Sequence, residues 1–325
     1  MPDKKPKTPK RAASQNPSAT TCIKLGQAQA DEILAFRARQ RKKRARALAA
    51  IPERALALEA PSIPTATLRT LGMPAATGIL IAEGDSWFDY PLHDVLSLLE
   101  DEHGYDVESV ARRGDGVEQM AYSKGQFADF ARRLEKLLRQ GRVPDAILLS
   151  GGGNDIAGEE FEVLLNHAAS GLPPVNPDIL RGVIDVRLRD AYVFLISGIT
   201  KISEQFLNRA IPILIHGYDF PVPDGRGFLG GFGPLPGPWL RPGFHKKGHL
   251  DQGKNTQVMH NVINVFNDML KGVSNLKEFG HVRFVDLRGT LANTNYKKNW
   301  ANELHPTGPG FELVTKEFAD ALAKL

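Results

Sequence analysis

Four short motifs in the sequence carry residues that could do covalent chemistry. The first, EGDSWFDYP (83–91), places Ser86 in a turn directly after an apolar segment. A serine hydroxyl exposed by such a turn can act as a nucleophile, and the backbone amides around it can point at an incoming carbonyl oxygen. Gly, Asp and Ser are also ordinary turn residues, so Ser86 could equally be a helix N-cap.

The other three motifs also follow apolar segments or precede a helix. RRGDG (112–116) contains Gly114, whose missing Cβ lets the backbone approach a ligand, although a plain turn glycine would look the same. SGGGNDIAG (150–158) puts three glycines ahead of Asn154, so that its amide can be aimed into a site as a donor to an anion. NELHPTG (302–308) holds His305 in a non-helical turn, where it could act as a general base.

Several other kinds of site are excluded or disfavoured. No GK[ST] follows the glycines, and a GxGxxG fingerprint with its downstream acid is absent, so neither a phosphate loop nor a dinucleotide site is expected. Asp85 and Asp155 lie in tight loops, where carboxylates normally accept backbone amides, and are interpreted as structural. We expect no metal and no cofactor, because four of the remaining histidines are scattered without metal-ligand spacing, namely His216, His245, His249 and His260.

The elements that must position these motifs alternate along the chain. Short apolar runs predict five strands, at 78–84, 106–111, 145–152, 211–219 and 281–289. Helical patterns fall between them, at 91–104, 117–141, about 178–208 and about 256–273, with a last helix from Pro306 onward. This alternation predicts a parallel sheet with helices on both faces, in which active sites lie beyond the carboxyl ends of the strands.

The order and context of the four motifs closely resemble the SGNH (GDSL-type) hydrolase family, whose name stands for Ser, Gly, Asn and His. GDSW and GGND are the most specific blocks, and the resemblance runs from about Gly78 to Leu325. It implies a flavodoxin-like three-layer α/β/α fold and a serine ester hydrolase. Ser86 would be the nucleophile and His305 the base, and the amides of Ser86 and Gly114 with the Asn154 side chain would form the oxyanion hole.

One position departs from the family pattern. The family usually places Asp three residues before the histidine, and this sequence has Asn302 there. Glu303 is the nearest carboxylate but is one position off, and a backbone carbonyl or a distant Asp could also orient the ring. We favour a Ser–His dyad with Asn302 as the catalytic partner of the imidazole, because the group that orients a base is separable from the base.

The N-terminal part differs in composition from the rest. Residues 1–60 hold 14 Lys and Arg against 5 Asp and Glu, which leaves 27 against 32 for the remainder. Residues 1–25 predict a disordered basic tail, and 26–70 a basic helix followed by a linker at Pro52. The helix could present a solvated face, contact nucleic acid or an anionic surface, or pack through Ile33, Leu34 and Phe36; we prefer the first or last interpretation.

The domain at 71–325 is interrupted at about 220–249 by a segment rich in Gly, Pro and aromatic residues, which predicts a long loop on the substrate side. Its rings would suit an acyl chain or a sugar, or could pack in the core: Phe220, Phe228, Phe232, Trp239 and Phe244. The sequence does not choose among esterase, lipase-like enzyme and carbohydrate deacetylase, so the partner is a small-molecule or glycan ester.

The location is predicted to be cytoplasmic. The charged, Pro-rich start lacks an apolar signal core, no window approaches 18 apolar residues, and the single cysteine, Cys22, fits a reducing compartment. The competing hypothesis is a catalytically silent protein of the same fold that uses its basic N-terminal segment as the working part.

Overall fold

A computed structural model describes residues 18–49, 76–230, 235–292 and 294–325. Its centre is one parallel sheet in the order β2-β1-β3-β4-β5. The strands are β1 (Gly78–Glu83), β2 (Tyr105–Ser109), β3 (Ala146–Leu149), β4 (Ile213–His216) and β5 (Val282–Val285). The predicted five-stranded parallel sheet is therefore confirmed, and its order is the flavodoxin-like one.

The central strands β3 and β4 form where the sequence is almost continuously apolar. Every residue of β3 (AILL) and of β4 (ILIH) is buried. Such runs are typical of parallel strands, because helices cover both faces of the sheet and leave no solvent-facing side. The carboxyl ends of β1, β3 and β4 meet at one edge, and the Ser86 and Asn154 motifs follow there.

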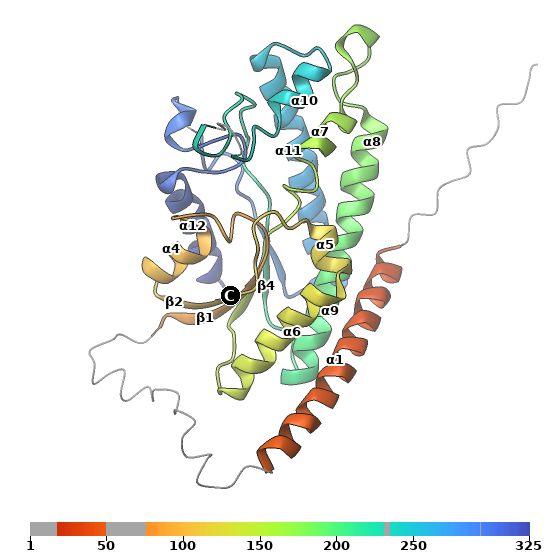
Figure 1. Cartoon of the computed structure of the whole chain (residues 1–325), viewed down its shortest axis with the longest axis vertical. Helices are drawn as coiled ribbons and strands as arrows, with labels where there is room; N and C mark the ends of the chain where they lie inside the picture. The colour runs from red at the N-terminus through yellow and green to blue at the C-terminus, as the bar shows by residue number, and fades with distance from the viewer. Residues whose placement is uncertain (1–17, 50–75, 231–234, 293) are drawn as a thin grey trace, which may run out of the picture.

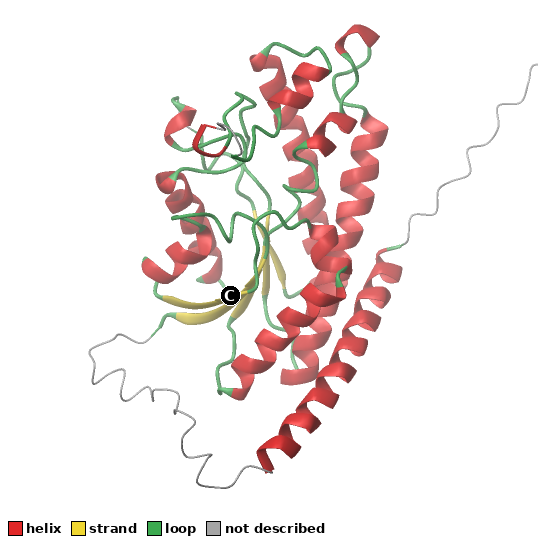
Figure 2. Ribbon diagram, in the orientation of Figure 1, coloured by secondary structure: helices red, strands yellow, loops and turns green. Residues whose placement is uncertain are grey.

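Helices cover the two faces, which gives the predicted three-layer α/β/α arrangement (Figures 1 and 2). One face carries α4 (Val95–Asp101) and α12 (Gly308–Leu322). The other carries α5 (Val117–Tyr122), α6 (Lys124–Arg139), α9 (Arg189–Leu207) and α11 (Gln252–Ser274). Shorter helices lie near the carboxyl edge of the sheet, namely α7 (Glu159–Leu164), α8 (Pro177–Arg181) and α10 (Arg241–Lys246).

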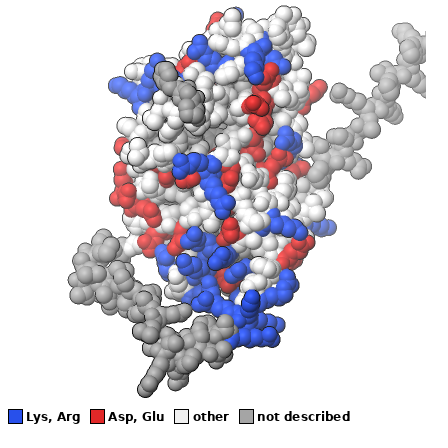
Figure 3. Space-filling model, viewed as in Figure 1, with Lys and Arg blue, Asp and Glu red and all other residues white. Residues whose placement is uncertain are grey.

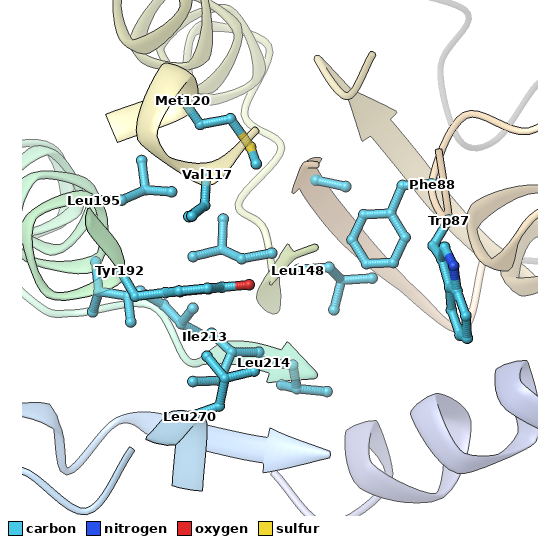
Figure 4. Close-up of a cluster of buried hydrophobic side chains, with 14 of the residues drawn as sticks. Trp87, Phe88, Val117, Met120, Leu148, Tyr192, Leu195, Ile213, Leu214 and Leu270 are labelled. Atoms are coloured by element: carbon cyan, nitrogen blue, oxygen red, sulfur yellow. The ribbon is translucent and has the colours of Figure 1, made fainter. Parts of the chain in front are cut away.

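The largest shared core lies between the sheet and the second helical layer (Figure 4). Side chains from α5, α9 and α11 meet the central strands there, and all are at most 2% exposed: Val117, Met120, Leu148, Tyr192, Leu195, Ile213, Leu214 and Leu270. Trp87 and Phe88, directly after Ser86, fill the other side of β1. Burial on both sides therefore fixes the strand end that carries Ser86.

The predicted helix at 117–141 is two helices. Ser123 has φ −78° and ψ 109°, which is extended backbone, and it separates α5 from α6. The break lets each short helix bury its own apolar stripe, with Met120 on α5 and Phe127 and Phe130 on α6. A single straight helix would have kept one stripe along one axis.

The predicted loop at 220–249 also contains structure. Residues 241–246 form the short helix α10, which begins with a proline at its start and buries Phe244 against Phe161. The buried carboxylate of Glu303 accepts the backbone amides at the start of this helix, which are donors that a helix leaves unpaired. The local sequence pattern does not predict α10, because Glu303, which binds the amides at its start, lies about 60 residues away along the chain.

The N-terminal helix α1 (Ala19–Ala49) begins at Ala19 rather than near residue 26, so the predicted disordered tail is helical over its last residues. It packs along α9, the partner with which it makes most of its contacts. Its buried face includes Cys22, Ala30, Ile33 and Leu34, whereas Phe36 is 44% exposed. Residues 1–17 and the expected linker at 50–70 lie outside the described residues.

A close approach of two helices holds α1 in place. A Cβ added to Gly26 would lie 2.2 Å from the carbonyl oxygen of Phe194 on α9. Across the same contact, a Cβ on Gly198 would lie 2.3 Å from Phe127 and 3.1 Å from the carbonyl oxygen of Gly26. The glycines therefore let the two backbones touch, which any larger residue would prevent.

Part of the basic charge of α1 is used inside the protein. Arg37 and Arg41 bind the carboxylate of Glu135 on α6 at 3.0 and 3.3 Å. Other cations of α1 and α6 remain on the surface around this contact, among them Arg44 and Arg132, and Figure 3 shows Lys and Arg gathered in this lower part of the face. None of the helices in the described ranges combines the length and apolar character needed to cross a membrane.

We predict that Gly26→Ala lowers the free energy of unfolding by about 1–3 kcal/mol, because the new methyl group forces α1 away from α9. Gly272→Ala on α11 is the matched control, since a Cβ there meets nothing within 4 Å. It should instead gain up to about 1 kcal/mol from helix propensity. Urea unfolding of the two variants measures both effects, and equal stabilisation by both would show that α1 does not pack on α9.

Candidate active site

Ser86 and His305 meet although they are far apart in the sequence. The Ser86 Oγ lies 2.7 Å from the Nε2 of His305. Ser86 is in the turn after β1, and His305 is in the turn before α12, whose N-cap is Thr307. The indole Nε1 of Trp87 donates to the carbonyl oxygen of Leu304 at 3.1 Å, which ties the two turns together. The distance is that of a serine hydroxyl able to donate to an imidazole base.

Asn302 fixes the orientation and the tautomer of the ring. Its Oδ1 accepts the backbone amides of Leu304 and His305, both at 2.9 Å, and lies 3.1 Å from the Nδ1 of His305. Its Nδ2 donates to the hydroxyl of Tyr90 at 3.1 Å. Backbone amides only donate, so the atom facing them is the oxygen, and Nδ1 must carry the proton of the neutral ring. Nε2 is thereby left free to accept the proton of Ser86.

His305 is held among aromatic rings. Tyr90 stacks on it with ring centroids 4.2 Å apart, and Trp239 meets it edge-on at 5.6 Å. Its burial lowers the pKa to about 3, since desolvation disfavours the charged ring. Its ring nitrogens face Ser86 and Asn302, so neither of these two contacts supplies a carboxylate that would favour the imidazolium.

Glu303 has a different role from the family's usual acid. One carboxylate oxygen accepts the amides of Gly225 and Arg241, and the other accepts those of Trp239 and Leu240, over 2.7–3.1 Å. Burial raises its pKa, which these four hydrogen bonds partly offset. Glu303 therefore anchors the segment 220–249 to the histidine turn, and its oxygens are already engaged.

The carboxylate of Asp85 joins three strand ends. It accepts the amide of Trp87 at 3.0 Å and the hydroxyl of Ser150 at 2.7 Å on one oxygen, and the hydroxyl of Tyr218 at 2.5 Å on the other. The Tyr218 hydroxyl in turn accepts the amide of Gly153 at 3.2 Å. The turns after β1, β3 and β4 are thus bonded to each other directly beneath Ser86. This agrees with the structural role expected for Asp85.

The sequence predicts that the amides of Ser86 and Gly114 and the side chain of Asn154 bind a developing oxyanion. Asn154 and Ser86 both line the same pocket. In the described part of the chain, the amides of Ser86 and Gly114 donate to no other protein group. Gly114 is exposed, with φ +88°, in the turn after β2, and it does not itself line the pocket. The turn that carries Gly114 is linked to Asn154 through the next residue, because Asn154 Nδ2 donates to the carbonyl oxygen of Asp115 at 3.0 Å.

The loops that carry Gly114 and Asn154 are also held together by Asp155. Its carboxylate accepts the amides of Val117 and Glu118 at 2.8 and 3.3 Å, which are the first orphan donors of α5. The Gly114 turn therefore cannot move independently of the loop that carries Asn154. Asp155 is a structural residue, as expected from the sequence.

Sequence reasoning missed Tyr90 and Tyr218. Tyr90 lies four residues after Ser86 and buttresses the base, and Tyr218 follows β4 at the edge of the sheet where the other motifs lie. The position of Tyr218 after a strand was the only available signal.

The aromatic residues of the 220–249 segment divide between two roles. Phe244 is fully buried in the core, while Phe228 packs on Tyr90 and Trp239 on His305. Phe220 stacks on His260 at 4.1 Å. Phe232 lies outside the described residues. In the ranges that the structure describes, no group of three His, Cys, Asp or Glu side chains could hold a metal ion.

Comparison with known proteins gives distant structural likenesses. No family model matches the chain, and no curated protein matches it in sequence. A lipase from a goat rumen metagenome is 14% identical, with a TM-score of 0.46 over 75% of this chain and 97% of its own. A putative GDSL-like lipase from Parabacteroides merdae is 14% identical, with a TM-score of 0.42 over 76% and 96%. An acetylxylan esterase from Geobacillus stearothermophilus is 14% identical, with a TM-score of 0.38 over 77% and 95%.

We predict that Asn302→Asp moves the acidic limb of the kcat/KM profile to higher pH. In the native chain, burial keeps the pKa of His305 at about 3, so the base stays neutral and activity holds well below the ordinary histidine value of about 6.5. A carboxylate at 302 would favour the imidazolium and raise that pKa, so activity would fall earlier as pH falls. We expect kcat to rise or hold. Ester hydrolysis measured against pH tests this, and an unmoved limb would mean that another acid already serves the ring.

Glu303→Gln separates anchoring from catalysis. The amide group of Gln would face backbone donors with its own donors, so thermal stability should fall. The acidic limb of the activity that remains should keep its native position. A shifted limb in this variant would make Glu303 the third member of the site and would disprove the dyad.

Proposed function

We propose that this chain is a serine ester hydrolase of the SGNH type. The observation that supports this most is the 2.7 Å contact between Ser86 and His305, beside a pocket that Asn154 also lines. A nucleophile, a base in the required tautomer and an anion donor are the minimum set for acyl transfer. The motifs that resemble the family contribute all of these groups.

In the first half-reaction, the Ser86 Oγ attacks the ester carbonyl carbon as His305 Nε2 takes its proton. The carbonyl oxygen becomes an oxyanion, which the Ser86 and Gly114 amides and the Asn154 side chain stabilise. When the carbon–oxygen bond to the alcohol breaks, the imidazolium gives its proton to the departing alcohol. The acyl group then remains on Ser86.

In the second half-reaction, His305 takes a proton from water, whose oxygen attacks the acyl-enzyme. The bond to Ser86 breaks, the proton returns to its Oγ and the acid leaves. Asn302 acts throughout as an acceptor for Nδ1–H, so it holds the ring without stabilising its charge as a carboxylate would.

The competing hypothesis is a silent protein of this fold that works through its basic segment. The preserved Ser86–His305 contact favours the enzyme, because a protein with no chemistry to do has no need for a free hydroxyl aligned on a buried neutral histidine. Arg37 and Arg41 also serve in packing α1 on α6, which accounts for part of the basic run without a ligand.

We predict that Ser86→Ala abolishes hydrolysis of p-nitrophenyl esters while thermal stability stays nearly unchanged. The hydroxyl is only partly buried and its one side-chain partner is His305, so its loss leaves no cavity. Turnover and the melting temperature of the same preparation test this. Full turnover in the variant would move the nucleophile elsewhere.

Asn154→Ala should lower kcat by roughly 10²-fold or more, with a smaller change in KM, because an oxyanion donor acts mainly in the transition state. Steady-state kinetics on one ester separates the two constants. A change confined to KM would make Asn154 a residue that binds the ground-state substrate.

A further inference from the structure

The pocket beyond Ser86 is apolar at the end formed by α11. Met259, Val262, Ile263 and Phe266 line it from that helix, with Ile156 and Leu240 opposite. All six are at most 8% exposed. Together they give the pocket that Ser86 also lines an apolar surface. A surface of this kind binds hydrocarbon, since water leaves it at little cost.

The charged groups that border this pocket are already satisfied by the protein. Asp85 accepts three donors and Glu303 accepts four amides, as described above. Asp219 accepts the amides of Phe220, Gly289 and Leu291 at 2.6–2.8 Å. No Lys or Arg is among the described residues that line the pocket. The polar side-chain groups left for a substrate are therefore those of the proposed reaction, Ser86, Asn154 and His305, and the indole N–H of Trp300, which donates to no acceptor among the described residues.

We propose that this pocket binds the acyl chain of the substrate, and that the chain is an unbranched, uncharged hydrocarbon of roughly four to six carbons. This inference rests on the proposed function, because it places the chain on the carbonyl that Ser86 attacks. It selects the fatty-acyl type of ester over an acetylated sugar whose ring would occupy the same space. A sugar ring needs several hydrogen-bond partners, and beyond the reacting groups the side chains of the described lining offer only the indole N–H of Trp300.

The size of the cavity sets the length. Its volume is about 60 Å³. One water needs about 10–15 Å³ of such volume, so the cavity takes roughly four to six waters, and a methylene is close to a water in size. A longer chain would have to extend out of this volume or displace buried side chains of α11, which a close-packed interior resists.

The test is a series of p-nitrophenyl esters of straight-chain acids from acetate to laurate. We expect kcat/KM to rise about fourfold with each added methylene up to butyrate or hexanoate, since each one is removed from water, and to fall for longer chains. A maximum at acetate would overturn the proposal. A second series, of butyrate esters with alcohols of increasing length, is the counterpart. The proposal would also be overturned if the rate depended on the length of the alcohol in that series and not on the length of the acid in the first.

Three variants locate the effect in the pocket. Ala157→Leu adds bulk at the lining and should cut hexanoate hydrolysis at least tenfold while acetate changes little. Met259→Ala enlarges the α11 wall and should move the optimum to longer chains. Met269→Ala is its matched control, because Met269 is a buried methionine of the same helix that does not line the pocket. The proposal is wrong if Met269→Ala shifts the optimum as far as Met259→Ala does, or if Ala157→Leu lowers acetate and hexanoate equally.

These outcomes are distinguishable from failure of the proposed function. If no ester in the series is hydrolysed, or if turnover survives Ser86→Ala, the hydrolase proposal is wrong. The proposal that the pocket binds an acyl chain is then wrong as well. If turnover depends on Ser86 but is fastest for acetate, the hydrolase proposal stands and the acyl pocket alone is wrong.

Discussion

The site depends on one buried carboxylate. Asp85 is 1% exposed, and a buried charge persists only when donors surround it. Its donors come from three different strand ends, through Trp87, Ser150 and Tyr218. The cost of leaving any of these bonds unmade therefore fixes the distance between the nucleophile turn and the loop that carries Asn154. The hydrogen bonds of Asp85, and not contacts between Ser86 and Asn154, therefore set the positions of these two residues.

The histidine side of the site is built on a different principle. Neutral groups surround His305, so its orientation comes from the Asn302 amide and the ring of Tyr90 while its charge remains unsupported. The nearest carboxylate in the sequence, Glu303, is committed to four backbone amides of the neighbouring segment. Adjacent residues of the turn before α12 thus have two different roles. Asn302 orients the ring of His305, and Glu303 anchors the 220–249 segment.

The sequence predicts what depends on local pattern and misses what depends on distant partners. The central strands are visible because β3 is wholly apolar and β4 is apolar up to His216, and Ser86, Asn154 and His305 stand out because each lies at the end of an element. The division of the 117–141 helix at Ser123 and the helix α10 are not visible in this way. The first reflects packing on the sheet, and the second needs Glu303. Tyr218 contributes through its hydrogen bond to Asp85, which lies in another turn, so no local sequence motif predicts its role.

The helix α1 has a consequence for the order in which the chain folds. It precedes the rest of the described domain in the chain, yet the backbone that meets Gly26 is on α9, on the order of 170 residues later. The apolar face of α1 can therefore be buried only after α9 has been made. Contacts between segments so far apart in the sequence form late and slowly. The run from Arg37 to Arg46 is densely charged, and like charges oppose the association of apolar faces that are still exposed.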